Sequence, residues 1–586
     1  MAITIAFRQP QHGMEVFRAG SILLMLCLTL FLLLSAKVVR ADDISSTLEE
    51  QETQRARERE RQLREQLEPS TDVRLPRDGA TEAEHLPAEE SPCFVINRIE
   101  LIDETGKFAW ARAAADLPDD AATGRCLGSR GINLVMTRIQ NAIIARGYVT
   151  TRVLAEAQDL SQGTLTLNII PGRVRAIRLA EGVSTRATLW NAFPIRPGDL
   201  LNLRDIEQGL ENLKRLPTTE ADIEIVPTET VGESDIVVTW KQDFPFRITL
   251  NANDGGSKST GKYQGSVTIS GEHLLTLNDL FYYSFGHDLG GADKSGSGTM
   301  NHSWHYSLPY GNWLLALNAN DYTYRQAVAG INQTYIYQGK NDSKEVKLSR
   351  LMYRDAVQKS YLWMRAYLTT MRNYIDDTEI EIQRRRMAGW ELGTDYRYYP
   401  KALPGSVLDA SLAYRHGTGM WDAMPAPEEK FGEGTSRPKI WSTEVNFSLP
   451  FQAFDQRFLY NADLRGQWND TPLVPTDRFS IGGRYTVRGF DGETILAAER
   501  GWLIRNDLGL ALGDSGQQIY IGLDHGEVGG QTAKLLLGRR LTGGVVGFRG
   551  AWKGFYYDTF IGKSLEAPKY FPTRSSVAGF NLTFTY

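Results

Sequence analysis

The chain has 586 residues, which is too long for one ordinary domain, so several domains are expected. Its 55 glycines and its 10% content of aromatic residues depart from the composition of an average soluble enzyme. The net charge of -5 favours neither a nucleic acid nor a polyanion as a partner.

The first residues have the three parts of a secretory signal peptide. Two arginines precede an apolar run over residues 22–34, and Val39 and Ala41 occupy the positions before a cleavage point after Ala41. The apolar run is shorter than the roughly 20 residues that a membrane-spanning helix needs. We therefore expect residues 1–41 to be removed, with a membrane anchor as the alternative. Because no later stretch is a long apolar run, any membrane contact of the mature protein would use strands.

Residues 42–67 consist largely of helix-forming residues in which glutamate and arginine are interleaved, and few of them are apolar. Such a helix cannot be buried in an apolar core, so it either is exposed to solvent or lies in a polar cavity. Residues 68–92 contain several prolines and many acidic residues without periodicity. This composition predicts a linker.

The next two segments each combine strands with one amphipathic helix, which predicts two α+β modules in tandem. In the first module, residues 93–172, we expect a helix with Asn133 as its N-cap and Gly147 as its stop. In the second module, residues 173–245, Asn202 is the expected N-cap.

Cys93 and Cys126 are the cysteines that remain once the signal peptide is removed, since Cys27 lies in its apolar run. An exported chain reaches an oxidising compartment, so we expect these two residues to form a disulfide. A zinc site is not expected there, because no histidine lies nearby to complete the ligand set.

Several motifs of the two modules occur in a characteristic order. They are Ala145–Val153, Gln158–Leu160, Gly163–Leu165 and Leu203–Leu210. These motifs resemble those of the two POTRA domains of two-partner-secretion outer-membrane transporters, the TpsB family of haemolysin secretion/activation proteins. The resemblance implies that a transmembrane barrel follows the modules.

From residue 246 onward the hydrophobic period is two, as in the last strand, where Phe580, Leu582 and Phe584 alternate with polar residues. A soluble sandwich would also alternate, but its strands have about five or six residues, whereas many of these run to about ten or more. Aromatic residues near strand ends are typical of the girdles of a barrel in lipid. We therefore predict a transmembrane antiparallel β-barrel of about 16 strands over residues 246–586.

A barrel of this size encloses a lumen that either conducts water or is plugged. A polar helix suits such a lumen, and the family resemblance implies that residues 42–67 form an N-terminal plug helix there. The linker over residues 68–92 can reach from the barrel to the first module. A plug in the lumen and a solvated helix remain alternatives at this stage.

Residues 481–492 interrupt the strand pattern with four glycines and two arginines. On composition alone they form an ordinary surface loop. The segment Val487–Phe490, however, resembles the signature of a long loop that folds back into the barrel in this family, and Gly522–Asp524 matches a second family motif. The resemblance implies an inward-folded loop over residues 472–495.

An arginine inside a barrel needs a carboxylate, because an unpaired charge in a confined space loses its hydration. Alternation along the strand places Asp524 on the inner face, so we expect a salt bridge between Arg488 and Asp524 in the lumen. Gly489 would allow the turn, and Phe490 would pack on the inner wall.

The segment Gly513–Gly516 copies a serine-protease signature, but no histidine and aspartate partners can be placed beside it. Its residues are ordinary in a hairpin loop. His302 and His305 lie three apart in a strand and so face opposite sides, which disfavours a shared metal. We expect no catalytic residue, no metal and no cofactor, and therefore no enzymatic activity.

The resemblance implies a transporter in the bacterial outer membrane with its POTRA domains in the periplasm. Its client would be a large β-helical exoprotein, such as an adhesin, a haemolysin or a contact-dependent toxin, which the modules recognise unfolded. Outer-membrane lipid is the other expected partner, a nucleic acid is not, and the chain is expected to be a monomer. The alternatives are a barrel-assembly insertase of the same superfamily and a passive porin. Two modules and a plug helix favour transport.

Overall fold

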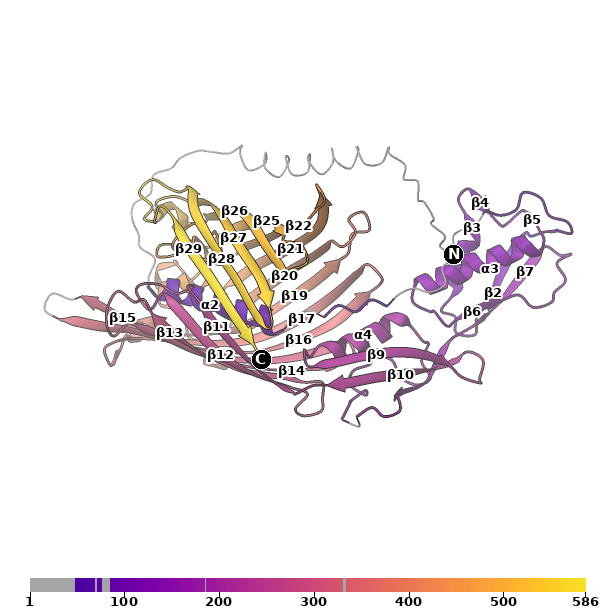
Figure 1. Ribbon diagram of the computed structural model, residues 1–586, viewed down its shortest axis with the longest axis horizontal. Coiled ribbons are helices and arrows are strands. Elements are labelled where there is room, and N and C mark those ends of the chain that lie inside the picture. Colours follow the sequence, from indigo (N-terminus) through magenta and orange to yellow (C-terminus); the bar gives the residue numbers. More distant parts are fainter. Residues whose placement is uncertain (1–47, 69–70, 76–84, 185, 330–332) are drawn as a thin grey trace.

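The computed structural model describes residues 48–68, 71–75, 85–184, 186–329 and 333–586. The predicted signal peptide lies outside the described residues. Within them, no helix has the length and apolar character that crossing a membrane requires. Figure 1 shows the barrel, the second module at its end and the first module beyond the second.

The first module, residues 93–172, is a three-stranded sheet covered by one α-helix, and its strands lie in the order β2-β7-β6. Strand β2 pairs parallel with β7, and β6 pairs antiparallel with it. The elements of this module are β1 (Phe94–Val95), β2 (Arg98–Ile102), η1 (Ala109–Ala115), β3 (Asp116–Leu117), β4 (Asp120–Ala121), β5 (Cys126–Leu127), α3 (Ser129–Ala145), β6 (Arg152–Leu154) and β7 (Thr164–Ile170).

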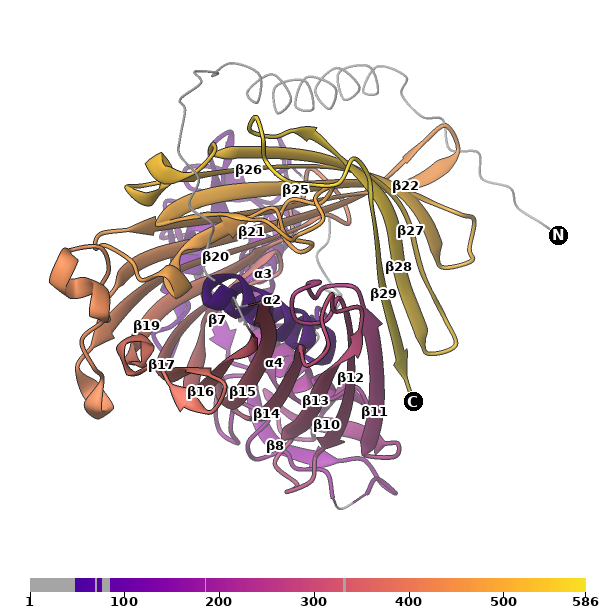
Figure 2. The ribbon, with the colours of Figure 1, turned by 90° about the vertical axis from the view of Figure 1, so that its left-hand side faces the viewer.

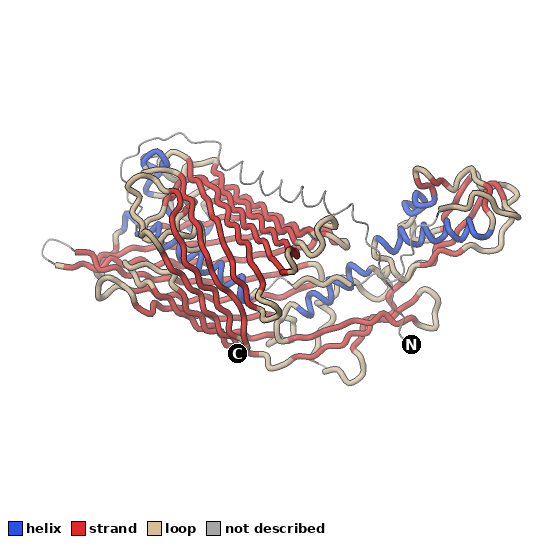
Figure 3. The backbone as a smooth tube through the Cα atoms, turned by 45° about the horizontal axis from the view of Figure 1, so that its top comes forward, coloured by secondary structure: helices blue, strands red, loops and turns tan. Residues whose placement is uncertain are grey.

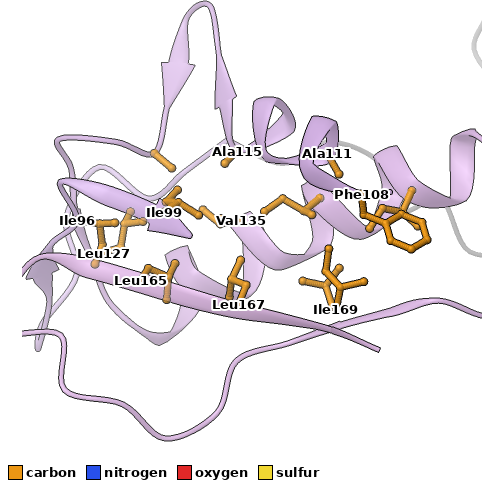
Figure 4. Close-up of a cluster of buried hydrophobic side chains, with 14 of the residues drawn as sticks. Ile96, Ile99, Phe108, Ala111, Ala115, Leu127, Val135, Leu165, Leu167 and Ile169 are labelled. Carbon is orange, nitrogen blue, oxygen red and sulfur yellow. The ribbon is translucent and has the colours of Figure 1, made fainter. Parts of the chain in front are cut away.

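The apolar core of the first module lies between α3 and the sheet (Figure 4). Val135 and Ile139 of α3 join one buried cluster with Leu165 and Leu167 of β7. The first pair is four residues apart and the second is two apart, so each pair lies on one face of its element. Hydrophobic periodicity is therefore sufficient to place these residues in the core.

Helix α3 begins at Ser129, so the prediction of Asn133 as its N-cap is wrong. Gly128 holds the N-cap position and has no side chain to offer. The Glu90 carboxylate accepts hydrogen bonds from the backbone N–H groups of Gly128 at 2.7 Å and Gly131 at 3.0 Å instead. Because this acceptor comes from the distant linker, a search for a capping residue next to the helix does not find it.

The second module, residues 173–245, repeats the arrangement with a sheet in the order β8-β10-β9. Its helix has Asn202 as N-cap, as predicted, and the Asn202 side chain accepts a hydrogen bond from the backbone N–H of Arg204 at 2.9 Å. The elements are β8 (Arg173–Leu179), α4 (Leu203–Lys214), β9 (Thr219–Pro227) and β10 (Glu233–Gln242).

The predicted antiparallel barrel is confirmed: sixteen long strands close it in the described part of the chain, and β29 pairs with β11. Strands make up almost all of the wall (Figure 3). Two-residue β18 (Thr378–Glu379) extends the hairpin after β17. The long strands are β11 (Phe246–Asn253), β12 (Tyr263–Glu272), β13 (Leu280–Gly290), β14 (Gly298–Tyr310), β15 (Trp313–Ala329), β16 (Thr334–Arg354), β17 (Gln358–Ile375), β19 (Arg385–Tyr398), β20 (Val407–Thr418), β21 (Lys439–Ala453), β22 (Gln456–Asn469), β25 (Arg500–Ala511), β26 (Gln517–Gly529), β27 (Arg540–Trp552), β28 (Phe555–Glu566) and β29 (Val577–Thr585).

Alternating exposure along β26 distinguishes the two faces of the barrel wall. The side chains of Ile519, Ile521 and Leu523 are exposed on the outside, whereas Tyr520 and Asp524 are buried inside. Apolar residues on the outer face and polar residues in the lumen are the arrangement of a barrel in lipid.

A buried ion pair in the first module joins β4, α3 and the end of the linker. Arg138 donates to the Asp120 carboxylate, and so does the backbone N–H of Leu86 at 2.8 Å. Arg125 lies 2.9 Å from the same carboxylate. The Leu86 hydrogen bond and the two arginines hold the pKa of Asp120 at about 2, below the usual value of about 3.9.

Asp120→Asn should lower the free energy of local opening of α3 by about 2 kcal/mol at neutral pH, because it removes charged hydrogen bonds. Since folding depresses this pKa, the contribution of the native carboxylate is complete above pH ~4 and is lost as the pH falls through about 2. Hydrogen exchange of α3 amides in the full chain measures the effect. Asp119→Asn is the control, because Asp119 is exposed. Equal exchange in both variants would contradict the assignment.

Candidate functional site

Helix α2 (Leu48–Leu67) lies inside the ring of barrel strands (Figure 2). Few of its residues are apolar, and the lumen gives it the polar surroundings that such a helix needs. The predicted plug segment began at residue 42, and residues 42–47 lie outside the described residues.

Ion pairs connect α2 to several sides of the lumen. Both signs of charge on the helix take part, so the interior of the barrel is complementary to it and not uniformly acidic or basic. The pairs and their shortest N–O distances are Arg57–Asp477 at 3.3 Å, Glu58–Arg465 at 3.1 Å, Arg61–Glu444 at 2.5 Å and Arg64–Glu345 at 2.5 Å.

Glu52 is the acidic residue of α2 with the smallest exposed surface, at 0%. Its carboxylate accepts hydrogen bonds from the hydroxyl groups of Tyr322 at 2.5 Å and Thr260 at 2.9 Å. Arg55, one turn later, lies 2.6 Å from the same carboxylate. These bonds satisfy a charge that would otherwise be costly to bury.

The first half of α2 also binds the inward loop, residues 472–495, which leaves the wall between β22 and β25. The side chain of Gln54 donates to the backbone carbonyl of Arg478 at 2.7 Å, and that of Arg55 donates to the carbonyl of Gly492 at 2.6 Å. The loop contains η5 (Pro475–Asp477) and β23 (Phe479–Ile481), and β23 pairs with β24 (Leu496–Ala498). The loop therefore supports the helix.

Arg488 of the inward loop lies against the inner face of the wall, with its side chain almost fully buried. Its guanidinium donates to the two carboxylate oxygens of Asp524 at 2.7 and 2.8 Å, and its backbone N–H donates to the same carboxylate at 2.9 Å. The structure thus brings together the two residues that the sequence analysis paired.

Asp507 on β25 completes this group, and the sequence analysis missed it. Its carboxylate accepts from the Arg488 guanidinium at 2.5 Å and from Arg549 at 3.1 Å. The available signal was strand pairing: Asp507 stands opposite Gly522, two residues before Asp524, so all three share the inner face.

Two glycines allow the loop to approach the wall so closely. Gly489 has a φ of +94°, and a Cβ there would lie 2.6 Å from the backbone oxygen of Lys563. A Cβ at Gly522 would lie 2.7 Å from the Arg488 guanidinium. The glycine of the Gly-x-Asp motif therefore leaves room for the arginine that the aspartate binds.

Phe490 is buried in a cluster formed by the inward loop and the ends of the neighbouring strands. Its ring meets that of Phe571 edge-on, with the centroids 5.9 Å apart. Apolar packing on one side of the loop thus accompanies the ionic contacts of Arg488 on the other.

The other residues that the sequence analysis named lie away from the group formed by Arg488, Asp507 and Asp524. Cys93 and Cys126 form a disulfide with their Cα atoms 5.3 Å apart. The segment Gly513–Gly516 forms the hairpin between β25 and β26, where the Ser515 hydroxyl donates to a backbone carbonyl. His305 faces the lumen and bonds to Ser307 and Asn318, while His302 bonds to Tyr283.

A polar cavity of about 490 Å³ remains in the lumen beside α2. Asparagine and serine side chains of the wall, including Asn251, Ser303 and Asn320, line it together with the arginines of the helix. The lumen is hydrophilic around α2, so a polar chain could occupy the space of the helix without a large desolvation penalty.

Comparisons with known proteins cover both halves of the chain. Residues 232–550 match the family described as haemolysin secretion/activation protein ShlB/FhaC/HecB. Residues 94–172 match the ShlB-type POTRA domain, and residues 173–227 match a further POTRA domain.

Individual relatives extend over most of the chain. The outer membrane transporter CdiB-2 of Burkholderia pseudomallei is 38% identical over 518 residues, which cover 84% of this chain and 86% of the relative. The hemolysin transporter protein ShlB of Serratia marcescens is 25% identical, with 66% and 67% covered. The solved structure of CdiB from Acinetobacter baumannii is similar with a TM-score of 0.80 at 30% identity, over 94% of this chain and 100% of that one.

Asp524→Asn should lower the free energy of unfolding of the barrel by roughly 3 to 5 kcal/mol, because it leaves a buried arginine short of a counter-charge. Asp507→Asn should have a smaller effect, since Arg488 then keeps Asp524. Urea titration followed by electrophoretic mobility measures both. Asp514→Asn is the control, with its side chain 95% exposed. Equal stability of all three variants would contradict a structural role for the pair.

Proposed function

The chain belongs to the haemolysin secretion/activation (ShlB/FhaC/HecB) family, and we propose that it exports one large partner protein through its barrel after α2 leaves the lumen. It is a transporter of the outer membrane that acts in two-partner secretion of an exoprotein, with its POTRA domains in the periplasm. Membership of this family favours transport over the insertase and porin alternatives.

The observation that carries the proposal is a helix held in a polar lumen by ion pairs and hydrogen bonds. The pairs from Arg61 and Arg64 to the wall are partly exposed, so each contributes on the order of 0 to 1 kcal/mol. An apolar core of similar size would hold the helix far more strongly. The helix can therefore be displaced while the wall stays intact.

We assign recognition of the exported protein to the two modules. Among the described residues, β2 and β6 are the edge strands of the first sheet and β9 is an edge strand of the second, whereas the edge of β8 is bridged at Arg173 by Leu200. An extended polypeptide can add as a further strand at such an edge, where main-chain hydrogen bonds tolerate many sequences. This mode of binding fits a client that reaches the periplasm unfolded. Folding of the large β-helical exoprotein outside the cell would give the transport its direction.

The remaining partners follow from the barrel itself. Its outer face carries exposed apolar side chains, which suits contact with outer-membrane lipid. One chain closes the barrel through the pairing of β11 with β29, so a single copy supplies a complete pore and the transporter acts as a monomer. We also propose that the chain transports its partner without any enzymatic activity of its own.

Deletion of residues 48–67 should raise the single-channel conductance of the purified protein in planar bilayers, because the deletion removes the helix from the lumen. The control is a chain with Arg152→Ala, an exposed residue of the first module. The control should conduct like the native protein. Unchanged conductance after the deletion would refute the role of α2 as a plug.

Export itself is tested by expressing the chain together with a large exported protein of repetitive β-helical pattern from a neighbouring gene. That protein should reach the medium with the native transporter and accumulate in the cell with Asp524→Ala, although the barrel still assembles in the membrane. Normal export by the variant would contradict a role of the Arg488–Asp524 pair in transport. Failure of the native chain to export the protein would contradict the assigned partner.

A further inference from the structure

Part of the linker is docked at the junction between the second module and the barrel. This segment, Thr71–Leu75, is called the docked linker here. Arg354, the last residue of β16, donates to the backbone carbonyl of Val73. The backbone N–H of Leu75 donates to Glu207 of α4 at 3.0 Å, and that of Val73 donates to Glu211 at 3.4 Å. Both walls of the junction therefore bind the main chain of an extended segment.

The side chains of the docked linker alternate in the environments that they enter. Val73 is 8% exposed and belongs to the buried core cluster of the second module, and Leu75 packs against the same cluster. Asp72 lies 3.2 Å from the ammonium group of Lys359. The Arg74 guanidinium lies on the same side as Asp72, 3.1 Å from its carboxylate, and stacks over the ring of Tyr399 at 3.7 Å. The junction thus accepts an acidic residue, then an apolar residue, and a second apolar residue two positions later.

The polar groups of this junction are buried and preorganised. Arg354 also binds Glu207 at 3.2 Å and Glu211 at 2.9 Å, and Lys359 binds Glu211 at 3.0 Å. The side chains of Arg354 and Glu207 are 4% and 0% exposed. These groups hold one another in place, so binding a peptide requires little further ordering of the site.

The docked linker also stands at the entrance to the lumen. A cavity of about 430 Å³ between α4 and the wall is lined by Thr71, Glu211 and Lys359, and by Asn446 of β21 farther inside. A polypeptide that entered the barrel between α4 and the wall would pass these residues.

The position of the docked linker restricts movement of α2. Leu67 at the end of α2 packs in a cluster with Leu216 of the second module and with Leu280 and Tyr282 of β13. Leu67 and Val73 are six residues apart, which allows a span of at most about 20 Å. A 20-residue helix is about 30 Å long. While the docked linker is bound, Leu67 therefore stays within about 20 Å of Val73, which restricts how far α2 can move.

We propose that this junction is a binding site for an extended segment of the exported protein, and that the docked linker is its tethered competitor. The segment would carry an acidic residue followed by apolar residues at the next position and at the third, the pattern of Asp72, Val73 and Leu75. Its arrival would displace the docked linker and free α2 to move. The inference rests on the proposed function, since it names the chemistry by which the exported protein opens the transporter.

A synthetic peptide with the sequence of residues 68–76 is the probe, and the full-length transporter in detergent is the target. In the variant Val73→Asp/Leu75→Asp the tethered segment no longer docks, so the site is vacant. The fluorescent peptide should bind this variant at least tenfold more tightly than the native chain, in which the docked linker competes. A peptide that carries the same two substitutions is the matched control and should bind neither. Equal binding of the native-sequence peptide to both chains, or to neither, would overturn the proposal.

A second measurement uses a chain that keeps its docked linker nearly intact. Cys93 and Cys126, which both lie in the first module, are joined in a disulfide, so an introduced cysteine can be labelled selectively with a maleimide. Val73→Cys should react at least tenfold more slowly than Arg74→Cys, because Val73 is buried and Arg74 is exposed. Excess peptide should accelerate labelling at position 73 several-fold and leave position 74 little changed. Labelling at position 73 that the peptide does not change would overturn the competition.

Neither the peptide-binding measurement nor the labelling measurement depends on transport. The proposed binding site and the proposed plug can therefore be refuted independently of each other. Absence of peptide competition refutes the binding site even where deletion of residues 48–67 opens the pore. Peptide competition together with unchanged conductance after that deletion supports the binding site and refutes the plug.

Discussion

The arrangement of the inward loop and α2 in the lumen depends on one buried cation, Arg488, which two carboxylates of the barrel wall hold. Asp524 binds both the guanidinium and the backbone N–H of this residue, so it positions the main chain of the inward loop as well as the side chain. With the loop in this position, Gly492 and Arg478 present their carbonyls to the first half of α2. Helix α2 is thus supported by a loop that is itself held by a buried charge pair.

Two kinds of interaction hold the molecule together: apolar packing in the modules and ion pairs in the lumen. The modules are built on dry clusters such as the one around Val135 and Leu167, which are suited to permanent structure. The lumen is built on charge complementarity, where both partners regain hydration when they separate. In the proposed mechanism, this difference lets α2 leave the barrel while the modules and the wall remain folded. Salt bridges are therefore well suited to a removable element, although they contribute little to stability individually.

In our proposal, the junction at α4 connects recognition of the exported protein to opening of the barrel. This helix has an apolar face in the core of its module and a polar face, with Glu207 and Glu211, against the hairpin of β16 and β17. The docked linker lies in the same place and is connected by a few residues of the chain to α2. Under this proposal, a change at the junction would reach α2 through a short covalent connection, without any requirement that the barrel wall change shape.

The sequence by itself determined the elements that depend on local periodicity and on short motifs: the two modules, the alternating strands of the barrel, the Asn202 cap and the pairing of Arg488 with Asp524. Only the tertiary structure decided which distant groups complete them. Glu90 caps a helix that begins 39 residues later, Asp507 joins the arginine from a neighbouring strand, and Val73 enters the core of a module that lies a hundred residues farther along the chain. The physical reason is the range of the interactions. Periodicity records which face of an element is buried, whereas hydrogen bonds and ion pairs between remote segments depend on how the folded elements meet.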